Sequence, residues 1–298
     1  MRIATWNVNS LKARQEAVDA WMERVKPDIL LMQETKLPDQ DAPVMSFAMR
    51  GYDLVHHGEG RWNGVAIAVR QGLGIAGITT NFGLGGVRDS SAGSSTAAGE
   101  EDFDPLDEAR MVSAVCGGVR VVCIYAPNGR VVGSPFFAGK LAWYDRLLQW
   151  LREACDPSDD LVIGGDFNIA PTDADVWDAG AVHGGTHVSP AERAAFGRLL
   201  DWGLIDAYRA VHEETGRYSW WDYRAGMFHK NNGMRIDHLL VTRSLAGRLV
   251  DAEIDREARK GPPVPSDHAP VTIDLDEAGA HYDPDWQGAL SRIAKRSR

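Results

Sequence analysis

The sequence predicts an α/β fold in which two β-sheets pack face to face and helices cover the outside. Apolar strand-like segments come in clusters, and segments with helical spacing lie between the clusters. This order fits two helix-covered sheets better than one doubly wound parallel sheet. We find no internal repeat and no dividing linker in the 298 residues. We therefore expect one domain over residues 1–275 and a tail over 276–298.

In the first half, strands and one helix follow each other closely. Ile3 to Trp6 is a short strand, and apolar residues from Leu11 to Val25 then recur at helical spacing before Pro27. Three more strands are expected at "DILLMQE", "YDLVHH" and "NGVAIAVR". The Gly-, Ser- and acid-rich stretch 83–109 interrupts this pattern and is predicted to be a long loop.

The second half adds two helices and further strands. "RMVSAVCGGVRVVCIYAPNG" is typical of a hairpin that turns at Gly117-Gly118. Phe137, Leu141, Tyr144, Leu148 and Leu151 mark an amphipathic helix. Ser189-Pro190 with Glu192 form a capping box for a helix that runs to about Trp202. The last strands are expected at "LVIGG", "MRIDHLLVT", "LVDAEIDRE" and "APVTIDL".

Composition is typical of a soluble globular protein. Hydrophobic residues make up 44% and charged residues 25% of the chain, and no apolar run approaches the roughly 18 residues of a membrane-spanning helix. The N-terminus has no signal-peptide core. Cys116, Cys123 and Cys155 show no metal-binding spacing, so we interpret them as reduced and buried. We expect a cytoplasmic protein that does not contact membranes.

Net charge gives a weak argument against nucleic acid as a partner. Acidic residues outnumber basic ones by 42 to 32, which gives a net charge of −10, whereas phosphate binding favours a basic surface. An acidic protein can still carry a local basic rim, and acidic groups can surround a divalent cation that inverts the local field.

The segment "LVIGGDFN" ends a buried strand with two polar side chains. Side chains at i and i+2 of an extended segment lie on one face, so Asp166 and Asn168 can reach into one site. The alternative is a turn in which the aspartate makes a local Asx hydrogen bond.

Polar groups follow the other predicted strands in the same way. Each alone has an ordinary interpretation as a turn, rim or capping residue, but a carboxylate inside an apolar strand, such as Asp237, needs a partner. Together they form a coherent chemical set. The strand-end groups are Asn7, Glu34, Tyr125, Asn128, Asp237, Asp267 and His268.

The chemistry of this set is that of phosphodiester hydrolysis. Asn7, Glu34 and Asp267 offer oxygen ligands, which suit Mg²⁺ or Mn²⁺ rather than zinc. His268 could act as an acid, as a base or as a hydrogen-bond donor to a phosphate, and Asp237 could orient it. Asp166 is a candidate to hold or deprotonate the attacking water. Tyr125 and Asn168 can donate to developing negative charge.

Several motifs then point to one family. In chain order they are "ATWNVNSLKAR", "MQETK", "NGVAIA", "YAPNG", "GDFNIAPTD", "YSWWDYR", "MRIDHLL" and "PSDHAPV". From about residue 1 to 275 the chain resembles the exonuclease III family of abasic-site endonucleases, within the endonuclease/exonuclease/phosphatase superfamily. The resemblance implies a four-layered αββα sandwich of two mixed β-sheets, with the site where the ends of the sheets meet. It also implies incision 5′ to abasic sites, 3′-phosphodiesterase or 3′-phosphatase activity and 3′→5′ exonuclease activity.

The resemblance also implies roles for particular residues. The expected substrate is double-stranded DNA with abasic sites or with blocked or recessed 3′ ends, and the expected protein is a monomer. The cofactor would be one or two Mg²⁺ ions, for which Mn²⁺ can substitute, with Asn7, Glu34, Asp166, Asn168, Asp267 and His268 as ligand candidates. The catalytic candidates are Tyr125, Asp166, Asn168, Asp237 and His268. The DNA-binding candidates are Asn9, Lys36, Asn128, Trp220, Arg224, Met234, Arg235 and Ile236.

Two alternatives share part of this pattern. Another phosphoesterase of the superfamily, such as a phosphoinositide phosphatase, a sphingomyelinase-like esterase or a nonspecific deoxyribonuclease, would share the Glu, Asp-x-Asn and Asp-His motifs. The aromatic segment "YSWWDY" with nearby Arg224, Lys230 and Arg235 discriminates against it, because this segment suits a nucleic-acid backbone and an extruded sugar. A catalytically dead binding module would be expected to lack a member of the polar set, and none is missing.

The basic rim for DNA is expected to comprise Lys12, Arg14, Lys36, Arg224, Lys230 and Arg235.

Overall fold

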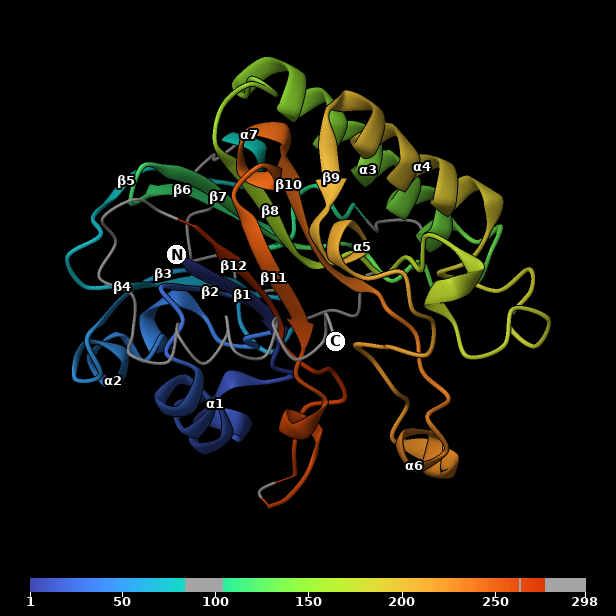
Figure 1. The fold of residues 1–298 in the computed structure, drawn as a ribbon, viewed down its shortest axis with the longest axis horizontal. Coiled ribbons are helices and arrows are strands. Elements are labelled where there is room, and N and C mark those ends of the chain that lie inside the picture. Colours follow the sequence, from blue (N-terminus) through green and yellow to red (C-terminus); the bar gives the residue numbers. More distant parts are fainter. Residues whose placement is uncertain (84–103, 263, 277–298) are drawn as a thin grey trace.

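Two mixed β-sheets packed face to face form the centre of the molecule, as the sequence predicts (Figure 1). The computed structural model describes residues 1–83, 104–262 and 264–276. Most of the predicted 83–109 loop and nearly all of the predicted tail lie outside these residues. Within the described part of the chain, each sheet has six strands.

The first sheet contains the N-terminal strands and the last two strands of the chain. Its order is β11-β12-β1-β2-β4-β3. β1 and β2 are parallel, whereas β12 runs antiparallel to β1, with Ile3 opposite Ile273. The strands are β1 (Arg2–Asn7), β2 (Ile29–Gln33), β3 (Tyr52–His57), β4 (Val65–Arg70), β11 (Leu249–Ile254) and β12 (Val271–Leu275).

The second sheet is built from the middle of the chain, in the order β5-β6-β7-β8-β10-β9. β7 and β8 are parallel, and β10 runs antiparallel to β8. The hairpin predicted at Gly117-Gly118 joins β6 to β7. The strands are β5 (Ile75–Thr80), β6 (Met111–Cys116), β7 (Val119–Tyr125), β8 (Leu161–Asp166), β9 (Leu204–Asp206) and β10 (Asp237–Thr242).

Helices cover both outer faces of the sandwich (Figure 1). On the first sheet lie α1 (Leu11–Val25) and α2 (Val44–Ala48), and on the second lie α3 (Pro135–Ala154) and α4 (Pro190–Trp202). Apolar side chains accordingly form one core between the sheets and one beneath each helical layer. Burial of these side chains is the main force that holds the four layers together.

The predicted start of α4 is confirmed in atomic detail. Ser189 accepts a hydrogen bond from the Glu192 amide, and the Glu192 side chain accepts one from the Ser189 amide, which completes the capping box of α4. Ser134 caps α3 in a similar way, by accepting from the Phe137 amide. Each cap satisfies backbone donors that have no partner inside the helix.

Two edge strands and one strand start differ from the sequence-based expectation. The expectation lacked β5 and β9, which are half-exposed edge strands of the second sheet. β10 begins at Asp237, three residues after the start of "MRIDHLL". Met234 pairs instead with Trp220 and Val176 in isolated bridges, so the loops before β10 hold the segment that precedes it.

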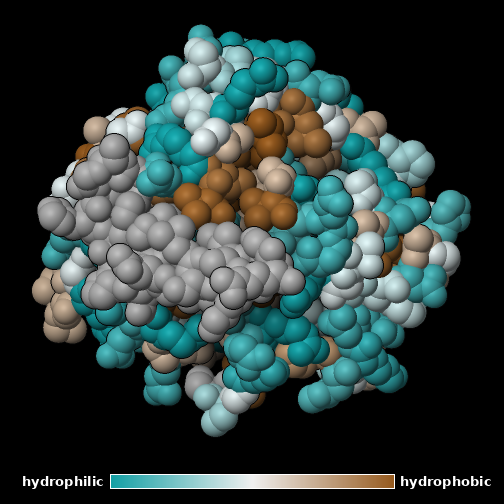
Figure 2. Space-filling model, viewed as in Figure 1, coloured by the Kyte–Doolittle hydropathy of each residue, from teal (hydrophilic) through white to brown (hydrophobic). Residues whose placement is uncertain are grey.

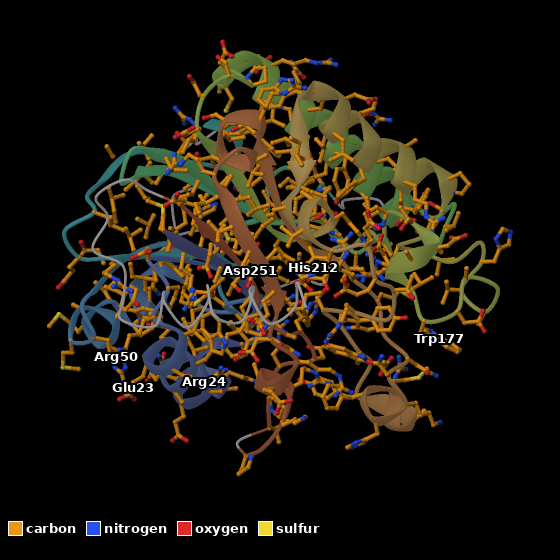
Figure 3. All side chains as sticks on the ribbon, in the orientation of Figure 1. Glu23, Arg24, Arg50, Trp177, His212 and Asp251 are labelled. Carbon is orange, nitrogen blue, oxygen red and sulfur yellow. The ribbon has the colours of Figure 1, made fainter. Side chains whose placement is uncertain are left out.

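The helix α5 (Ala207–Val211) packs against β10 of one sheet and β11 of the other. His212, which caps it, lies beside Asp251 of β11 (Figure 3). Its Nε2 donates to the Ala252 carbonyl oxygen at 2.6 Å. α5 therefore ties the two sheets together at one side of the sandwich.

The face shown in Figure 2 is mostly hydrophilic, with hydrophobic residues gathered in the upper middle of the view. Among the described helices, none combines the length and the apolar run that crossing a membrane requires. The three cysteines carry free thiols. Cys116 and Cys123 are buried as expected, whereas Cys155, at the end of α3, is only partly buried.

Candidate active site where the ends of the two sheets meet

The predicted polar residues gather at one edge of the sandwich because of the strand directions. β1 and β2 are parallel and end at Asn7 and Gln33, so Glu34 follows at the same edge. In the other sheet, β7 and β8 are parallel and end at Tyr125 and Asp166, which are register partners. Antiparallel strands begin where these strands end: Asp237 opens β10 opposite Asp166.

Two glycines before Asp166 let the end of β8 lie close to β7, to β10 and to the first sheet. A Cβ atom on Gly165 would lie 1.9 Å from the Ile124 carbonyl oxygen. On Gly164 it would lie 2.6 Å from side-chain carbons of Leu31 and Leu239. The "GGD" sequence thus allows the end of β8 to lie against β7 and against the first sheet, which brings Asp166 to the groups of β1 and β2.

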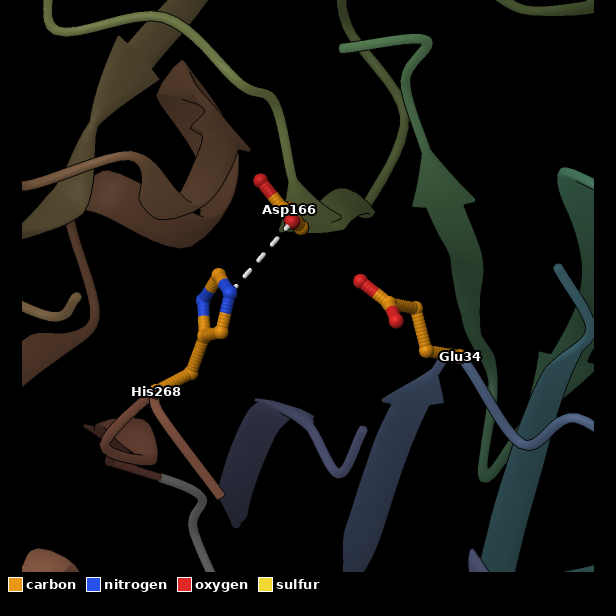
Figure 4. A group of neighbouring side chains, drawn as sticks. All are labelled: Glu34, Asp166 and His268. Atoms are coloured by element: carbon orange, nitrogen blue, oxygen red, sulfur yellow. Dashed lines mark ion pairs between the residues drawn. The ribbon is translucent and has the colours of Figure 1, made fainter. Parts of the chain in front are cut away.

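Asn7 joins the carboxylates of the two sheets. Its Nδ2 donates to Glu34 Oε1 at 2.8 Å and to Asp166 Oδ2 at 2.9 Å. Glu34, Asp166 and His268 each offer a ligand atom, and these atoms lie within 4.8 Å of one another (Figure 4). This group, drawn from three segments far apart in the chain, is the candidate metal cluster.

His268 and Asp237 form a buried pair next to this cluster. Asp237 Oδ2 lies 2.8 Å from His268 Nδ1, so Nδ1 carries the proton, and Nε2 points to Asp166, 3.8 Å from its Oδ2. Burial lowers the pKa of His268, but the charges of Asp237 and Asp166 outweigh it and raise the pKa to about 10. The imidazole therefore presents an N–H donor toward the site.

The two carboxylates of the cluster differ in acidity. Burial is the largest influence on Asp166, and it raises the pKa of this carboxyl to about 7 even though His268 acts in the opposite direction. Burial also raises the pKa of Glu34, but Lys36, the Asn7 amide and His268 together bring it below its ordinary value. Asp166 is thus suited to exchange a proton near neutral pH, and Glu34 to remain charged.

Amide and phenol groups from the second sheet complete the site. Asn168 has a left-handed backbone, with φ 51°, and its Nδ2 donates to the Ala126 carbonyl oxygen. Asn128 Nδ2 donates to Asn168 Oδ1 at 3.2 Å. Burial, and then the charge of Glu34, raise the pKa of Tyr125 well above its ordinary value, so its hydroxyl is a neutral donor.

Both interpretations of the Asp-x-Asn segment hold in part. The backbone N–H of Asn168 donates to Asp166 Oδ1 at 2.9 Å, which is the local Asx hydrogen bond. Asp166 Oδ2 is bound by Asn7 from the other sheet, so the same carboxylate also faces the site. Because Asn168 is left-handed rather than extended, strand alternation does not explain its direction; the Asx turn does.

A second chain of hydrogen bonds links the remaining candidates on the first-sheet side. Lys36 Nζ lies 2.8 Å from Glu34 Oε2 and donates to Asn9 Oδ1 at 2.7 Å. Asn9 Nδ2 donates to Asp267 Oδ1, and the Trp220 indole N–H donates to Asp267 Oδ2 at 3.1 Å. Asp267 is therefore held beside the cluster by partners of its own.

The other DNA-binding candidates lie in different surroundings. Trp220 and Met234 are partly buried and pack, next to buried Ile236, in a small apolar cluster beside the site. Arg224 is on the surface, with its side chain 87% exposed and paired with Asp222. Lys12 and Lys230 are exposed as well, and Arg14 reaches the Tyr223 hydroxyl.

Arg235 is not part of an exposed rim. Its side chain is 1% exposed, and its guanidinium is paired with Asp175 at 2.7 Å and with Asp206 at 2.8 Å. Both partners come from other loops and strands, so the sequence around Arg235 gives no sign of them. The buried ion network fixes the entry to β10 and, two residues later, Asp237.

Sequence reasoning missed a group of buried residues behind the site, although it identified one of them, Glu192, as a helix-capping residue. Lys140, Glu192 and His187 lie beneath the loops that carry Asn128 and Asn168. Lys140 could have been noticed, because it stands between Phe137 and Tyr144 on the apolar face of the predicted helix. The left-handed backbones of Asn9, Ser10, Glu34, Lys36 and Asn168 were also not foreseen.

Comparison with known proteins agrees with this geometry. A family model described as Endonuclease/Exonuclease/phosphatase family matches residues 4–268, and the chain belongs to this family. Exodeoxyribonuclease III of Haemophilus influenzae is 32% identical over 91% of this chain and 98% of its own length.

Solved structures give the same picture. The 3′ phosphatase NExo from Neisseria, solved with a product DNA hairpin, has a TM-score of 0.81 and 38% identity over 93% of this chain and all of its own. An AP endonuclease from Archaeoglobus fulgidus has a TM-score of 0.82 and 32% identity over the same shares. The expected resemblance to the exonuclease III branch, whose members are metal-dependent hydrolytic nucleases, is confirmed.

Proposed function

We propose that this protein is a Mg²⁺-dependent DNA-repair phosphodiesterase that acts on duplex DNA at abasic sites and at blocked or recessed 3′ ends. Residues 1–275 would form its catalytic domain, and it would work as a monomer in the cytoplasm, at the chromosome. One observation carries this proposal: polar groups from both sheets meet at the same edge of the sandwich. There the Asn7–Glu34–Asp166 hydrogen-bond network lies beside the Asp237–His268 pair and Asn168.

The residues present fit a divalent cation. Glu34 and Asp166 supply charged oxygen atoms that lie close together. Asn7 turns its Nδ2 toward both carboxylates, and its Oδ1 accepts from the Asn9 backbone amide, so it would add a neutral oxygen ligand once its side-chain amide turns over. Oxygen-rich sets of this kind suit Mg²⁺ or Mn²⁺. Asn168 and Asp267 are the further candidates for one or two ions, and His268 is a candidate only in its neutral form, in which Nε2 carries no proton. When bound, the cation would polarise the scissile phosphate and offset its charge.

The chain's own groups supply the remaining steps. Asp166 would accept a proton from the attacking water, for which its raised pKa suits it. As the new phosphorus–oxygen bond forms, the bond to the leaving 3′ oxygen breaks, and this oxygen would take up a proton from water to become a 3′ hydroxyl. The phosphate stays on the 5′ carbon of the downstream nucleotide or abasic sugar, and from a 3′-phosphate end it would leave as inorganic phosphate. His268 Nε2–H, oriented by Asp237, would donate to a phosphate oxygen, and the Asn168 amide and Tyr125 hydroxyl would stabilise the charge that develops there.

Binding of DNA would rest on the rim and on the apolar cluster at its side. The candidate cations are Lys12, Arg14, Lys36, Arg224 and Lys230, without Arg235. Asn9 and Asn128 could contact the backbone. An extruded sugar without a base would lie against Trp220 and Met234, next to Ile236, whereas a normal nucleotide would first have to be unstacked.

The test is an assay on three duplexes with the purified protein. The duplexes carry an abasic-site analogue, a 3′-phosphate or a plain recessed 3′ end, and each is incubated with Mg²⁺, with Mn²⁺ or with excess chelator. We expect hydrolysis with either metal, none in chelator, and full recovery when Mg²⁺ is restored. Full turnover in chelator would exclude the metal assignment, and no cleavage of any duplex would exclude the function.

A further inference from the structure

A buried lysine holds both asparagines of the site by their backbones. Lys140 is fully buried in α3, and its Nζ donates to the Asn168 carbonyl oxygen at 2.7 Å and to the Asn128 carbonyl oxygen at 3.3 Å. The side chains of these same two asparagines are hydrogen-bonded to each other at the site. The Lys140 ammonium group thus hydrogen-bonds to the backbones of both asparagines.

Glu192, also fully buried, holds the lysine in place. Its Oε1 lies 2.5 Å from Lys140 Nζ and accepts from the His187 amide at 2.9 Å, while its Oε2 belongs to the capping box of α4 with Ser189. His187 Nδ1 in turn donates to the Asn168 carbonyl oxygen at 2.6 Å. Three loops that follow β7, follow β8 and precede α4 therefore converge on this ion pair.

Burial of this ion pair is not by itself expected to stabilise the fold. Removing two charges from water carries a penalty that can exceed their attraction, and buried ion pairs can often be replaced by apolar or neutral groups without loss of stability. The surroundings are nevertheless shaped around the lysine. At Gly129, which has φ +82°, a Cβ atom would lie 2.9 Å from Lys140 Cδ.

We propose that Lys140, fixed by Glu192, is a positioning residue that sets the Asn168 and Asn128 amides for transition-state stabilisation. This inference rests on the proposed function of the site. Asn168 has a left-handed backbone, which the donors on its carbonyl oxygen help to maintain. Without Lys140 the loop loses that constraint, and the Asn168 amide loses its alignment to the developing charge.

The first experiment neutralises the pair and keeps the cap. In Lys140→Met/Glu192→Gln, the glutamine can still accept the hydrogen bonds of the capping box. We expect kcat on the best of the three duplexes to fall about tenfold to a hundredfold, somewhat less than the loss seen when an oxyanion donor is removed outright. KM and the melting temperature should change little.

The matched control breaks another ion pair between the same two helices. Arg198 of α4 lies 2.5 Å from Asp145 of α3, but both side chains are exposed and neither contacts the asparagines. Arg198→Met/Asp145→Asn should leave kcat and KM unchanged. If the two double variants lose kcat equally, the effect comes from helix packing and the inference fails.

A cycle with Asn168→Ala separates positioning from a general structural effect. If Lys140 acts through Asn168, the double variant should lower kcat much less in the Asn168→Ala background than in the wild type. Equal losses in both backgrounds would overturn the inference, as would an unchanged kcat in the folded double variant. A wild type without activity would instead contradict the proposed function and not this inference.

A pair of glycine variants keeps the inference testable if the double variant does not fold. In Gly129→Ala the added Cβ atom presses on the Lys140 side chain, and no charge is removed. In Gly133→Ala the backbone has a similar positive φ of +84° and therefore similar strain, but nothing lies within 4 Å of the added Cβ atom. We expect kcat to fall several-fold in Gly129→Ala only. Equal kcat in the two variants would overturn the inference.

Discussion

The two sheets hold their halves of the site in different ways. On the first-sheet side, Glu34 is paired with Lys36, and the two side chains are 18% and 27% exposed. On the second-sheet side, the asparagine loops are fixed by Lys140 and Glu192, which are both fully buried. The first half is thus held by partly exposed hydrogen bonds among its own members, and the second is held from behind by the protein interior.

This difference corresponds to what each half has to do. In the proposed function a cation and a DNA phosphate enter beside Glu34, so partners that water can replace are suitable there. Donors that stabilise a transition state contribute most when they are set before the substrate arrives. The halves therefore suggest an adaptable side for binding and a preset side for the developing charge.

The largest expected effect comes from Asp166, the carboxylate at the junction of the two halves. Asp166→Asn keeps the shape but removes the charge and the basicity, and we expect kcat to fall by about 10² to 10⁴. Binding of duplex DNA should persist, because repulsion of the phosphates decreases. Single-turnover rates and fluorescence anisotropy measure the two properties. The exposed Asp173, changed to Asn, is the control, and a near-wild-type rate in Asp166→Asn would remove Asp166 from its proposed role.

An intermediate effect is expected at the apolar cluster beside the site. Trp220→Ala should weaken incision at an abasic site by about tenfold, the scale of one lost aromatic contact, and weaken exonuclease action on a plain 3′ end less. Met234→Ala should show the same direction.

Trp220→Phe is the matched variant, because it keeps an apolar ring but loses the N–H bond to Asp267. It should retain most of the preference for the abasic duplex. Rates on both duplexes are compared for each variant, with thermal melts to verify folding. If the two activities fall in parallel in Trp220→Ala and Met234→Ala, these residues do not form a pocket for damaged sugars.

The smallest expected effect concerns Lys36 on the adaptable side. Lys36→Met removes a cation that competes with a metal for Glu34, so a lower Mg²⁺ concentration should give the half-maximal rate. If Lys36 also contacts one phosphate, the slope of log affinity against log salt should become shallower by about 0.9. Lys260→Met, at a surface ion pair with Glu257, should change neither quantity. An unchanged metal requirement and an unchanged slope would show that Lys36 serves neither purpose.

Sequence patterns predicted the layers and the strand-end residues because both depend on local periodicity. Apolar runs locate β1, β2, β7 and β8, and parallel pairing brings their ends together whatever the loops do. Buried ion pairs do not follow from local pattern. Arg235 was predicted as a surface cation, and its partners Asp175 and Asp206 are 60 and 29 residues away. Lys140 and Glu192 are 52 residues apart and were not connected.

Backbone conformation was equally hidden from the sequence. Glu34, Lys36 and Asn168 adopt left-handed backbones that only the surrounding contacts stabilise, for example the bonds from Thr35 and Lys36 amides to the carbonyl oxygens of Gly64 and Asn63. No local pattern distinguishes these residues from ordinary loop residues. The sequence therefore predicted which residues come together in the site, but not the backbone conformations that set the directions of their side chains.

The pairing of β12 with β1 has a consequence for the synthesis of the protein. Glu34 is made early and Asp166 midway, but His268 stands just before β12, which must dock beside β1 at the other end of the chain. A ribosome-bound chain that has not yet released residues 268–275 thus lacks one wall of the site. Nuclease activity would appear only when translation of the domain is complete, so unfinished chains would not cut nucleic acid.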